Sequence, residues 1–270
     1  MGTLSVIQQR TVTNPSGTKG ANLNIITTKQ YKLNKSASRG VLTAGIQLAP
    51  STEASTVLGR SDLIDVCSMA GVCKELCLKF TGRNQYPTHA LARARRNALL
   101  HDDPEAFYAQ VIRELRAVER KAMRENMDFA IRPNALSDLP KLAHRIALEF
   151  PDANVYDYTK LPKPWMRTRP NYTLAYSVSE RSTDADILGA IEHGINCAVV
   201  LDVRKGEPLP ATYTLAGVTL PVWDGDVSDL IYTYPTGVII GLRWKGSKAR
   251  LAVAVKAKFA RSIIPLTLAA

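Results

Sequence analysis

Several features that would assign a function directly are missing from this chain of 270 residues. It has no run of about eighteen apolar residues, so we expect no membrane span. The N-terminus lacks a charged stretch followed by an apolar one, and we therefore expect no signal peptide. A phosphate-binding P-loop, a glycine-rich dinucleotide fingerprint and a nucleophile elbow are also absent, which argues against P-loop nucleotide hydrolysis and serine-hydrolase chemistry.

Acidic residues are missing from both ends of the chain. Residues 1–50 contain six Lys or Arg and no acid, and residues 230–270 contain seven and no acid, within a net charge of +11. The remaining middle part holds 22 basic and 24 acidic residues, so the whole positive excess lies in the two ends. If both ends fold to the same side, they form a basic surface suited to phosphate backbones. Solubility alone is the alternative explanation.

Cysteine is scarce, and three of the four cysteines lie close together. Four cysteines in a chain of this length do not make a disulfide scaffold. Cys67, Cys73 and Cys77 have the spacing C-x5-C-x3-C, and a helical turn would place the last two on one face. Three thiolates suit a [4Fe–4S] cluster or a zinc ion, for which His89 is the nearest fourth ligand. Cys197 begins an apolar run and is expected in the core.

Apolar runs alternate with helical patterns along most of the chain. Strands are expected at 41–49, 129–131, 155–158, 172–177, 197–202 and 238–242, and helices at 88–100, from 104, at 140–149 and from 183, with a polar loop at 51–61. This alternation predicts an α/β fold whose parallel βα units form a curved sheet or a partial (β/α) barrel. We expect a basic arm or β-hairpin over 1–40, an α/β domain with a Cys-rich loop over 41–250, and a basic segment over 251–270.

Polar side chains follow the ends of several predicted strands. Because sites in parallel α/β folds form at the carboxyl ends of strands, these side chains predict one shared pocket. Turns, caps or plain surface positions are the alternative for each of them. The predicted cofactor-binding residues are Arg132, Asn134, Lys160, Ser177, Ser179, Glu180 and Asp202.

Two further segments carry charged groups of interest. A proline-stiffened loop combines basic side chains with an aromatic ring, a combination able to stack a base and hold phosphates, although it is also typical of an ordinary exposed loop. Its predicted nucleic-acid contacts are Lys163, Trp165, Arg167 and Arg169. The acidic cluster of Asp224, Asp226 and Asp229 fits either a Mg²⁺ site or a glycine-containing turn.

Several of these stretches, taken in order, resemble the bacteriophage "gene product eighty-eight"-like family of uncharacterised proteins. The resemblance covers roughly residues 65–250. Its most specific parts are Tyr156-Asp157-Tyr158-Thr159-Lys160 and Asp224-Gly225-Asp226, and Asn134-Ala135-Leu136-Ser137-Asp138 is another matching stretch. It implies a phage origin, the cytoplasm of the infected host as location, and a distant similarity to radical S-adenosylmethionine barrels. The cysteine spacing here differs from the C-x3-C-x2-C that is usual in those enzymes.

Two functional hypotheses follow. In the first, a radical-S-adenosylmethionine-like barrel binds an iron–sulfur cluster, with S-adenosylmethionine as a candidate ligand of the open iron, and acts on nucleic acid or nucleotides. In the second, the chain is a non-enzymatic nucleic-acid-binding phage protein with a zinc or vestigial metal site. Whether the protein is an enzyme stays open at this point.

Overall fold

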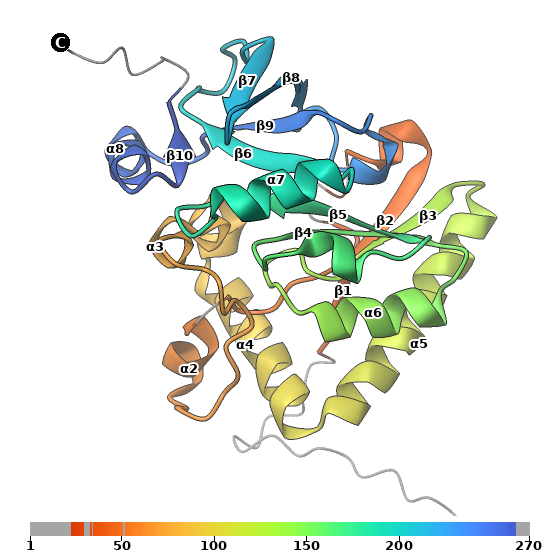
Figure 1. The fold of residues 1–270 in the computed structure, drawn as a ribbon. Coiled ribbons are helices and arrows are strands. Elements are labelled where there is room, and N and C mark those ends of the chain that lie inside the picture. Colours follow the sequence, from red (N-terminus) through yellow and green to blue (C-terminus); the bar gives the residue numbers. More distant parts are fainter. Residues whose placement is uncertain (1–22, 30–32, 34, 51, 263–270) are drawn as a thin grey trace, which may run out of the picture.

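A ten-stranded sheet forms the centre of the protein (Figure 1). The structure, a computed structural model, describes residues 23–29, 33, 35–50 and 52–262. The strands, in chain order, are β1 (Ile26–Thr27), β2 (Val41–Ile46), β3 (Asp128–Arg132), β4 (Asn154–Thr159), β5 (Tyr172–Ser177), β6 (Cys197–Leu201), β7 (Thr212–Leu215), β8 (Val218–Asp224), β9 (Ile239–Arg243) and β10 (Ala260–Arg261).

The strand order explains why the carboxyl ends of many strands meet. It runs β1-β2-β3-β4-β5-β6-β9-β8-β7, and β10 pairs with β6. From β2 to β8 all neighbours on this path are parallel, and only the end strands β1 and β7 pair antiparallel. This confirms the α/β class and the parallel units. Among the described strands the path is open at both ends, so closure into a barrel stays a prediction.

The helices occur mostly where the sequence patterns indicated. They are α2 (Glu53–Leu58), α3 (Cys73–Leu76), α4 (Pro87–Asp102), α5 (Pro104–Arg124), α6 (Pro140–Glu149), α7 (Asp184–Glu192) and α8 (Lys248–Lys256). Short 3-10 turns are η1 (Ala37–Arg39), η2 (Leu78–Phe80), η3 (Gly82–Gln85), η4 (Pro164–Arg167) and η5 (Ile231–Thr233). The prediction of a polar loop over 51–61 was wrong, because α2 lies there, with Ala54 buried against α4.

One face of the sheet is covered by amphipathic helices. Asp103 caps α5 by accepting a hydrogen bond from the Ala106 N–H (3.0 Å), and the buried stripe of that helix begins at Phe107. α5 and α6 bury their stripes against the outer side chains of β2 to β5, and α7 packs against β6. The periodic apolar positions therefore correctly indicated which sides of these helices are buried.

The opposite face of the sheet, called here the inner face, is covered by the segment between β8 and β9. Its η5 turn packs Ile231 and Tyr234 against Ala130, Tyr156 and Ala175 of the sheet. These inner-face residues lie two positions before Arg132, Tyr158 and Ser177, which are nearer the carboxyl ends of the same strands. The carboxyl ends of the same strands extend past this cover, which leaves room for a cavity above it.

The two ends of the chain are only partly described. β1 pairs antiparallel with β2, which lies beyond the predicted arm, and residues 1–22, 30–32 and 34 of that arm lie outside the described residues, so the predicted hairpin over 1–40 stays a prediction. At the other end, α8 and β10 place the basic C-terminal segment beside β6. In the described part of the chain, the helices are too short or too polar to cross a membrane.

Candidate functional site

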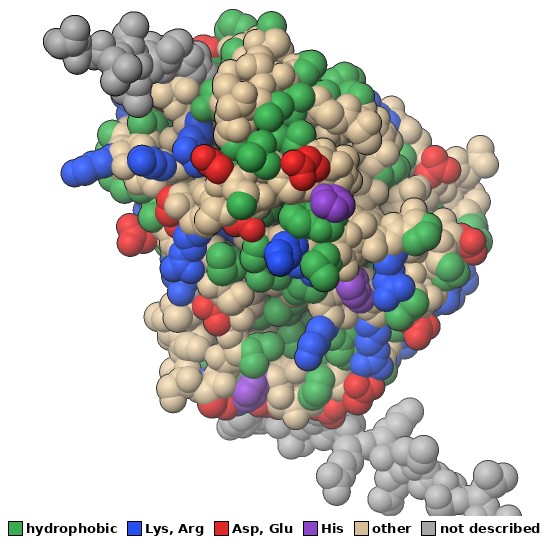
Figure 2. All heavy atoms as spheres, in the orientation of Figure 1, with side chains coloured by type: hydrophobic (Ala, Val, Ile, Leu, Met, Phe, Trp, Pro, Cys, Tyr) green, Lys and Arg blue, Asp and Glu red, His purple; other side chains and the backbone are tan. Residues whose placement is uncertain are grey.

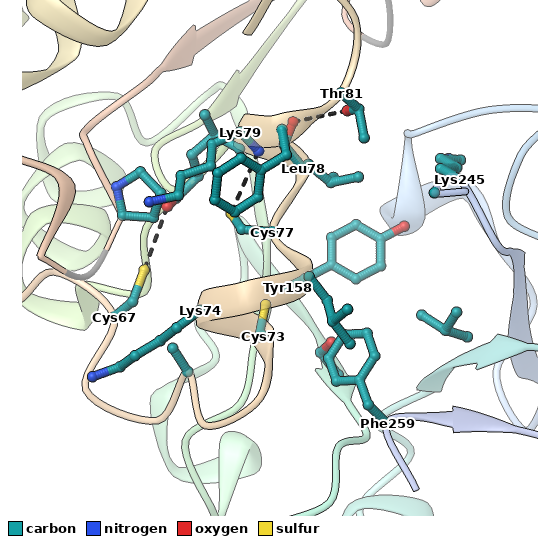
Figure 3. Close-up of a pocket in the computed structure, with 18 of the residues that line it drawn as sticks. Cys67, Cys73, Lys74, Cys77, Leu78, Lys79, Thr81, Tyr158, Lys245 and Phe259 are labelled. Atoms are coloured by element: carbon teal, nitrogen blue, oxygen red, sulfur yellow. Dashed lines mark hydrogen bonds between the residues drawn. The ribbon is translucent and has the colours of Figure 1, made fainter. Parts of the chain in front are cut away.

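A cavity of about 670 Å³ lies at the carboxyl ends of the parallel strands (Figure 3). Its floor consists of inner-face side chains from successive strands, since residues two apart in a strand point to the same face. These floor residues are Arg132 of β3, Tyr158 of β4, Ser177 of β5, Val200 of β6 and Leu242 of β9. The walls come from residues 67–82, which follow β2, and from residues 244–250, which follow β9.

All three clustered cysteines line this cavity. Cys73 begins the one-turn helix α3 and Cys77 follows its end, so the two thiols share one side of the turn, as the four-residue spacing predicted. Cys67 donates a hydrogen bond from its Sγ to the carbonyl of Leu136 (3.4 Å). Figure 3 shows Cys73 and Cys77 at the short helix α3 and Cys67 on the loop beside it. The cysteine segment thus forms one wall of the cavity.

The three cysteine sulfurs do not all lie within 4.8 Å of one another. Among the described residues, the only three His, Cys, Asp or Glu side chains whose ligand atoms all lie within 4.8 Å of one another are Asp62, His101 and Asp102. That group is already bonded to Arg60, which donates to both carboxylates at 2.5–3.0 Å. The cysteine thiols are therefore spaced more widely than the ligands of one tetrahedral zinc ion.

The thiols of Cys73 and Cys77 share a hydrogen bond. A hydrogen bond from Cys77 lowers the pKa of Cys73 to about 6, against the opposing effect of burial, and the nearby Lys160 ammonium adds to the lowering. The same hydrogen bond, together with burial, raises the pKa of Cys77. The pair therefore holds one thiolate near neutral pH. A thiolate is the form that ligates metals.

Glu180, which follows β5, holds the cysteine segment in place. Its Oε1 accepts a hydrogen bond from the Val72 N–H (2.8 Å). Gly71 lies directly under this carboxylate, with a φ of +49°, and a Cβ at that position would be 1.9 Å from the same oxygen. The contact joins the loop after β2 to the loop after β5, and we call it the Glu180 latch.

The cavity is lined by many cations and one carboxylate. Lys160 reaches Ser177, to which its Nζ donates a hydrogen bond (3.2 Å), and no described carboxylate lies within 4.0 Å of this ammonium. Arg132 pairs with the buried Asp229 and lies over the Tyr158 ring. Asp138 is the one acidic residue of the lining. The electrostatic character of the cavity favours an anionic ligand.

The predicted cofactor-binding residues divide into two groups. Arg132, Asn134, Lys160 and Ser177 line the cavity, whereas Ser179, Glu180 and Asp202 do not. Ser179 is buried in the turn after β5, where its hydroxyl accepts from the Arg181 N–H (3.3 Å). Arg132 and Ser177 lie within their strands, whereas Asn134 and Lys160 follow strand ends, so position relative to the strand end does not by itself decide which of these residues reach the cavity.

Asn134 organises the loop between β3 and α6. Its amide oxygen accepts from the Ser137 hydroxyl (2.8 Å) and from the Leu139 N–H (2.9 Å), and its Nδ2 donates to Oδ2 of Asp157 (2.9 Å). The Asn134 N–H donates to the other oxygen of Asp157 (2.8 Å). With its hydrogen-bonding groups used in this way, Asn134 positions the cavity wall.

The buried Asp157 carboxyl makes stability dependent on pH. Burial raises the pKa of Asp157 to about 7, although the hydrogen bonds from Asn134 act in the opposite direction. The folded protein therefore binds more protons than the unfolded chain between about pH 4 and pH 7, so the free energy of unfolding should fall across this range, by on the order of 4 kcal/mol. Chemical denaturation at several pH values measures this slope. The Asp157→Asn variant should flatten it, and an unchanged slope in that variant would contradict the assignment.

The predicted nucleic-acid loop is partly packed against the protein. Trp165 stacks on His193, with ring centroids 4.5 Å apart, and contacts Gly189 of α7. Arg167 donates to the carbonyls of Pro162 and Leu161, both at 2.9 Å. Lys163 and Arg169 are exposed, and none of the four residues lines the cavity.

The remaining sequence candidates have structural partners. Asp224 and Asp226 pair with Arg243, and Asp226 also pairs with Lys245 (2.7 Å), so a salt-bridged turn accounts for this acidic cluster. Cys197 is fully buried in the core, as expected, and burial raises its pKa to about 12. His89 does not line the cavity.

Several residues of the cavity wall were missed in the sequence. Phe80 is 41% exposed, with the cations of Lys79 and Arg250 over its ring at 4.9 and 4.8 Å. Trp244 and Phe259 come from the C-terminal part of the chain. The only available signal was the basic composition of residues 230–270, which gave no position relative to the cysteines.

The family of the chain follows from its match to a family model. The model described as Gene product 88 matches residues 19–262. The chain belongs to the Gene product 88 family. The matched residues include all those that line the cavity. Membership of the family supports the phage origin expected from the resemblance. No curated protein and no solved structure matches the chain, so similarity to radical S-adenosylmethionine barrels stays a prediction.

Proposed function

We propose that this Gene product 88 protein holds an iron–sulfur cluster on Cys67, Cys73 and Cys77 and binds an anionic small molecule beside it. The observation that carries the proposal is the placement of three cysteines on one wall of a cavity at the carboxyl ends of parallel strands. In parallel α/β folds, ligands bind at this edge of the sheet.

The donor set fits a cluster better than a single zinc ion. A cluster distributes its cysteines over several irons, and so it accepts thiolates that do not meet within 4.8 Å. Zinc needs a fourth ligand, and no His lines the cavity among the described residues. The cations of Lys74, Lys79 and Lys160 in the cavity wall offset the negative charge of thiolate-bound iron.

The side chains opposite the cysteines supply an anion-binding surface. Lys160 and Ser177 together offer an ammonium and a hydroxyl on the floor of the cavity. These groups suit a carboxylate, such as that of S-adenosylmethionine, or a phosphate of a nucleotide. When bound, a cluster with three protein thiolates supplies an open iron and a one-electron redox centre. The residues of the chain position the ligand and exclude water from it.

A non-enzymatic nucleic-acid-binding protein is the second candidate function. The strongly basic ends of the chain favour it. In that case the cysteines hold zinc or no metal. Metal content separates the two candidates.

The test is metal analysis of protein purified without oxygen and reconstituted with iron and sulfide. We expect about four irons per chain, acid-labile sulfide and a broad absorption near ~400 nm. Cys73→Ser should lose nearly all of this iron. Cys197→Ala removes the core cysteine and serves as the matched control, which should retain it. Protein that contains neither iron nor sulfide after reconstitution, or that binds one zinc instead, would refute the cluster.

A further inference from the structure

A second and larger hollow adjoins the cysteine cavity. This groove has a volume of about 1680 Å³ and is lined by residues from β1 and its flanks, the start of α4, the loop after β6 and the start of α8. Leu78, Thr81 and Gly82 on one side and residues 243–246 on the other line both hollows. The groove therefore leads directly into the cavity. We call it the basic groove.

Its lining is strongly cationic. Two carboxylates line the groove, those of Asp226 and Asp229, and both are already paired with arginine or lysine. The lining cations are Lys29, Lys35, Arg83, Arg96, Arg204, Lys205, Arg243, Lys245 and Lys248. Figure 2 shows basic side chains gathered around α8, while on the rest of that face both signs are mixed.

Five of these cations have no carboxylate partner within the described part of the chain. They are exposed and come from four segments far apart in the sequence: Lys29, Arg83, Arg204, Lys205 and Lys248. An elongated array of unpaired cations matches a polyanion with regularly spaced charges rather than one small anion. The two basic ends of the chain thus meet at one groove, with residues of the middle part between them.

We propose that the basic groove binds the phosphodiester backbone of a single-stranded nucleic acid and admits one nucleotide of it to the cysteine cavity. A cavity of about 670 Å³ has room for one nucleotide-sized group. Bases of an intact duplex are paired and stacked, and cannot enter a side cavity without being extruded. Phe80, exposed between Lys79 and Arg250, offers a ring for stacking at the cavity wall.

The part of this inference that concerns the cavity rests on the proposed function, because it assigns the substrate class of that site. Binding of the nucleic acid in the groove does not rest on the proposed function. The cations of the groove are present whether or not the cysteines hold a metal, so the experiment uses both metal-free and reconstituted protein.

Fluorescence anisotropy with a labelled single strand of about 16 nucleotides tests the groove. With five unpaired cations, log K should fall with log salt with a slope of about −3.5, or about 100-fold between 50 and 200 mM salt. The triple variant Arg83→Glu, Arg204→Glu, Lys205→Glu should bind at least about tenfold more weakly. The slope of log K against log salt should become shallower by about two. DNA, RNA and duplex of the same sequence are compared.

A matched control carries the same change in charge elsewhere. Arg113→Glu, Arg120→Glu and Arg124→Glu alter exposed α5 arginines outside both hollows, and this variant should bind like the wild type. Equal losses of affinity in the two triple variants, or no binding by the wild type, would refute nucleic-acid binding in the groove. Duplex binding as tight as that of the single strand would overturn the single-strand assignment.

Alkylation of the metal-free protein with iodoacetamide tests whether the strand reaches the cavity. At an oligonucleotide concentration of about ten times Kd, modification of Cys67, Cys73 and Cys77 should slow about tenfold. In the groove triple variant the same concentration should give less protection. Unchanged alkylation under saturated binding would overturn entry into the cavity, while iron content would still report separately on the cluster.

Discussion

The Arg132→Met variant is expected to be less stable than the wild type by about 3–5 kcal/mol in free energy of unfolding, because it removes one half of a buried ion pair. Asp229 is 2% exposed and pairs with the Arg132 guanidinium. The Tyr156 hydroxyl, 3.5 Å from the same carboxylate, is a weak substitute. Urea denaturation followed by circular dichroism measures the loss.

The Arg145→Met variant is the matched control for this prediction. Arg145 makes a two-pronged pair with Glu105 (2.8 and 2.7 Å), but their side chains are 42% and 75% exposed. Solvent screening limits such a pair to about 0–1 kcal/mol. Similar losses in the two variants would show that the buried pair is not what fixes the β8–β9 segment to β3. A much larger loss for Arg132→Met supports that role.

The sequence was most informative where one physical cause acts alone. The stripe beginning at Phe107 and the Asp103 cap specify α5 through local spacing, and both occur in the structure. The sequence was a poorer guide to which polar residues near strand ends line the cavity. Arg132 and Ser177, which lie within strands, line the cavity, but the alternation of side chains gives no direction for residues beyond a strand end.

Long-range partners account for what could not be predicted. Glu180 was predicted to line the pocket, yet its carboxylate contacts Val72, more than a hundred residues earlier in the chain. Asp157 stands between two tyrosines of β4 and faces the helix-covered side of the sheet. There Asn134 donates hydrogen bonds to both of its carboxylate oxygens. The basic groove joins four segments that are brought together only by the strand order. Composition indicated its charge and could not indicate its location.

If Cys67, Cys73 and Cys77 hold the proposed cluster, the Gly71→Ala variant is expected to bind iron about 10–100-fold less tightly, which is the usual effect of losing a residue that orients metal ligands. Alanine at a φ of +49° costs about 1–2 kcal/mol, and its Cβ would fall 1.9 Å from the Glu180 carboxylate. The latch must then open, and α3 with Cys73 loses its fixed position. Iron per chain after reconstitution, and its rate of removal by a chelator, measure the effect.

Two further variants distinguish backbone strain at Gly71 from loss of the Glu180 latch as the cause. Gly59 also has a positive φ, +65°, but a Cβ there meets nothing within 4 Å, so Gly59→Ala should keep its iron. Glu180→Ala removes the obstructing carboxylate together with the hydrogen bond to Val72. If the clash with Glu180 is the cause, adding Gly71→Ala to Glu180→Ala should produce little further loss of iron, because the latch is already open. Additive losses would instead assign the effect to backbone strain at Gly71, and the latch would not be what positions the cysteines.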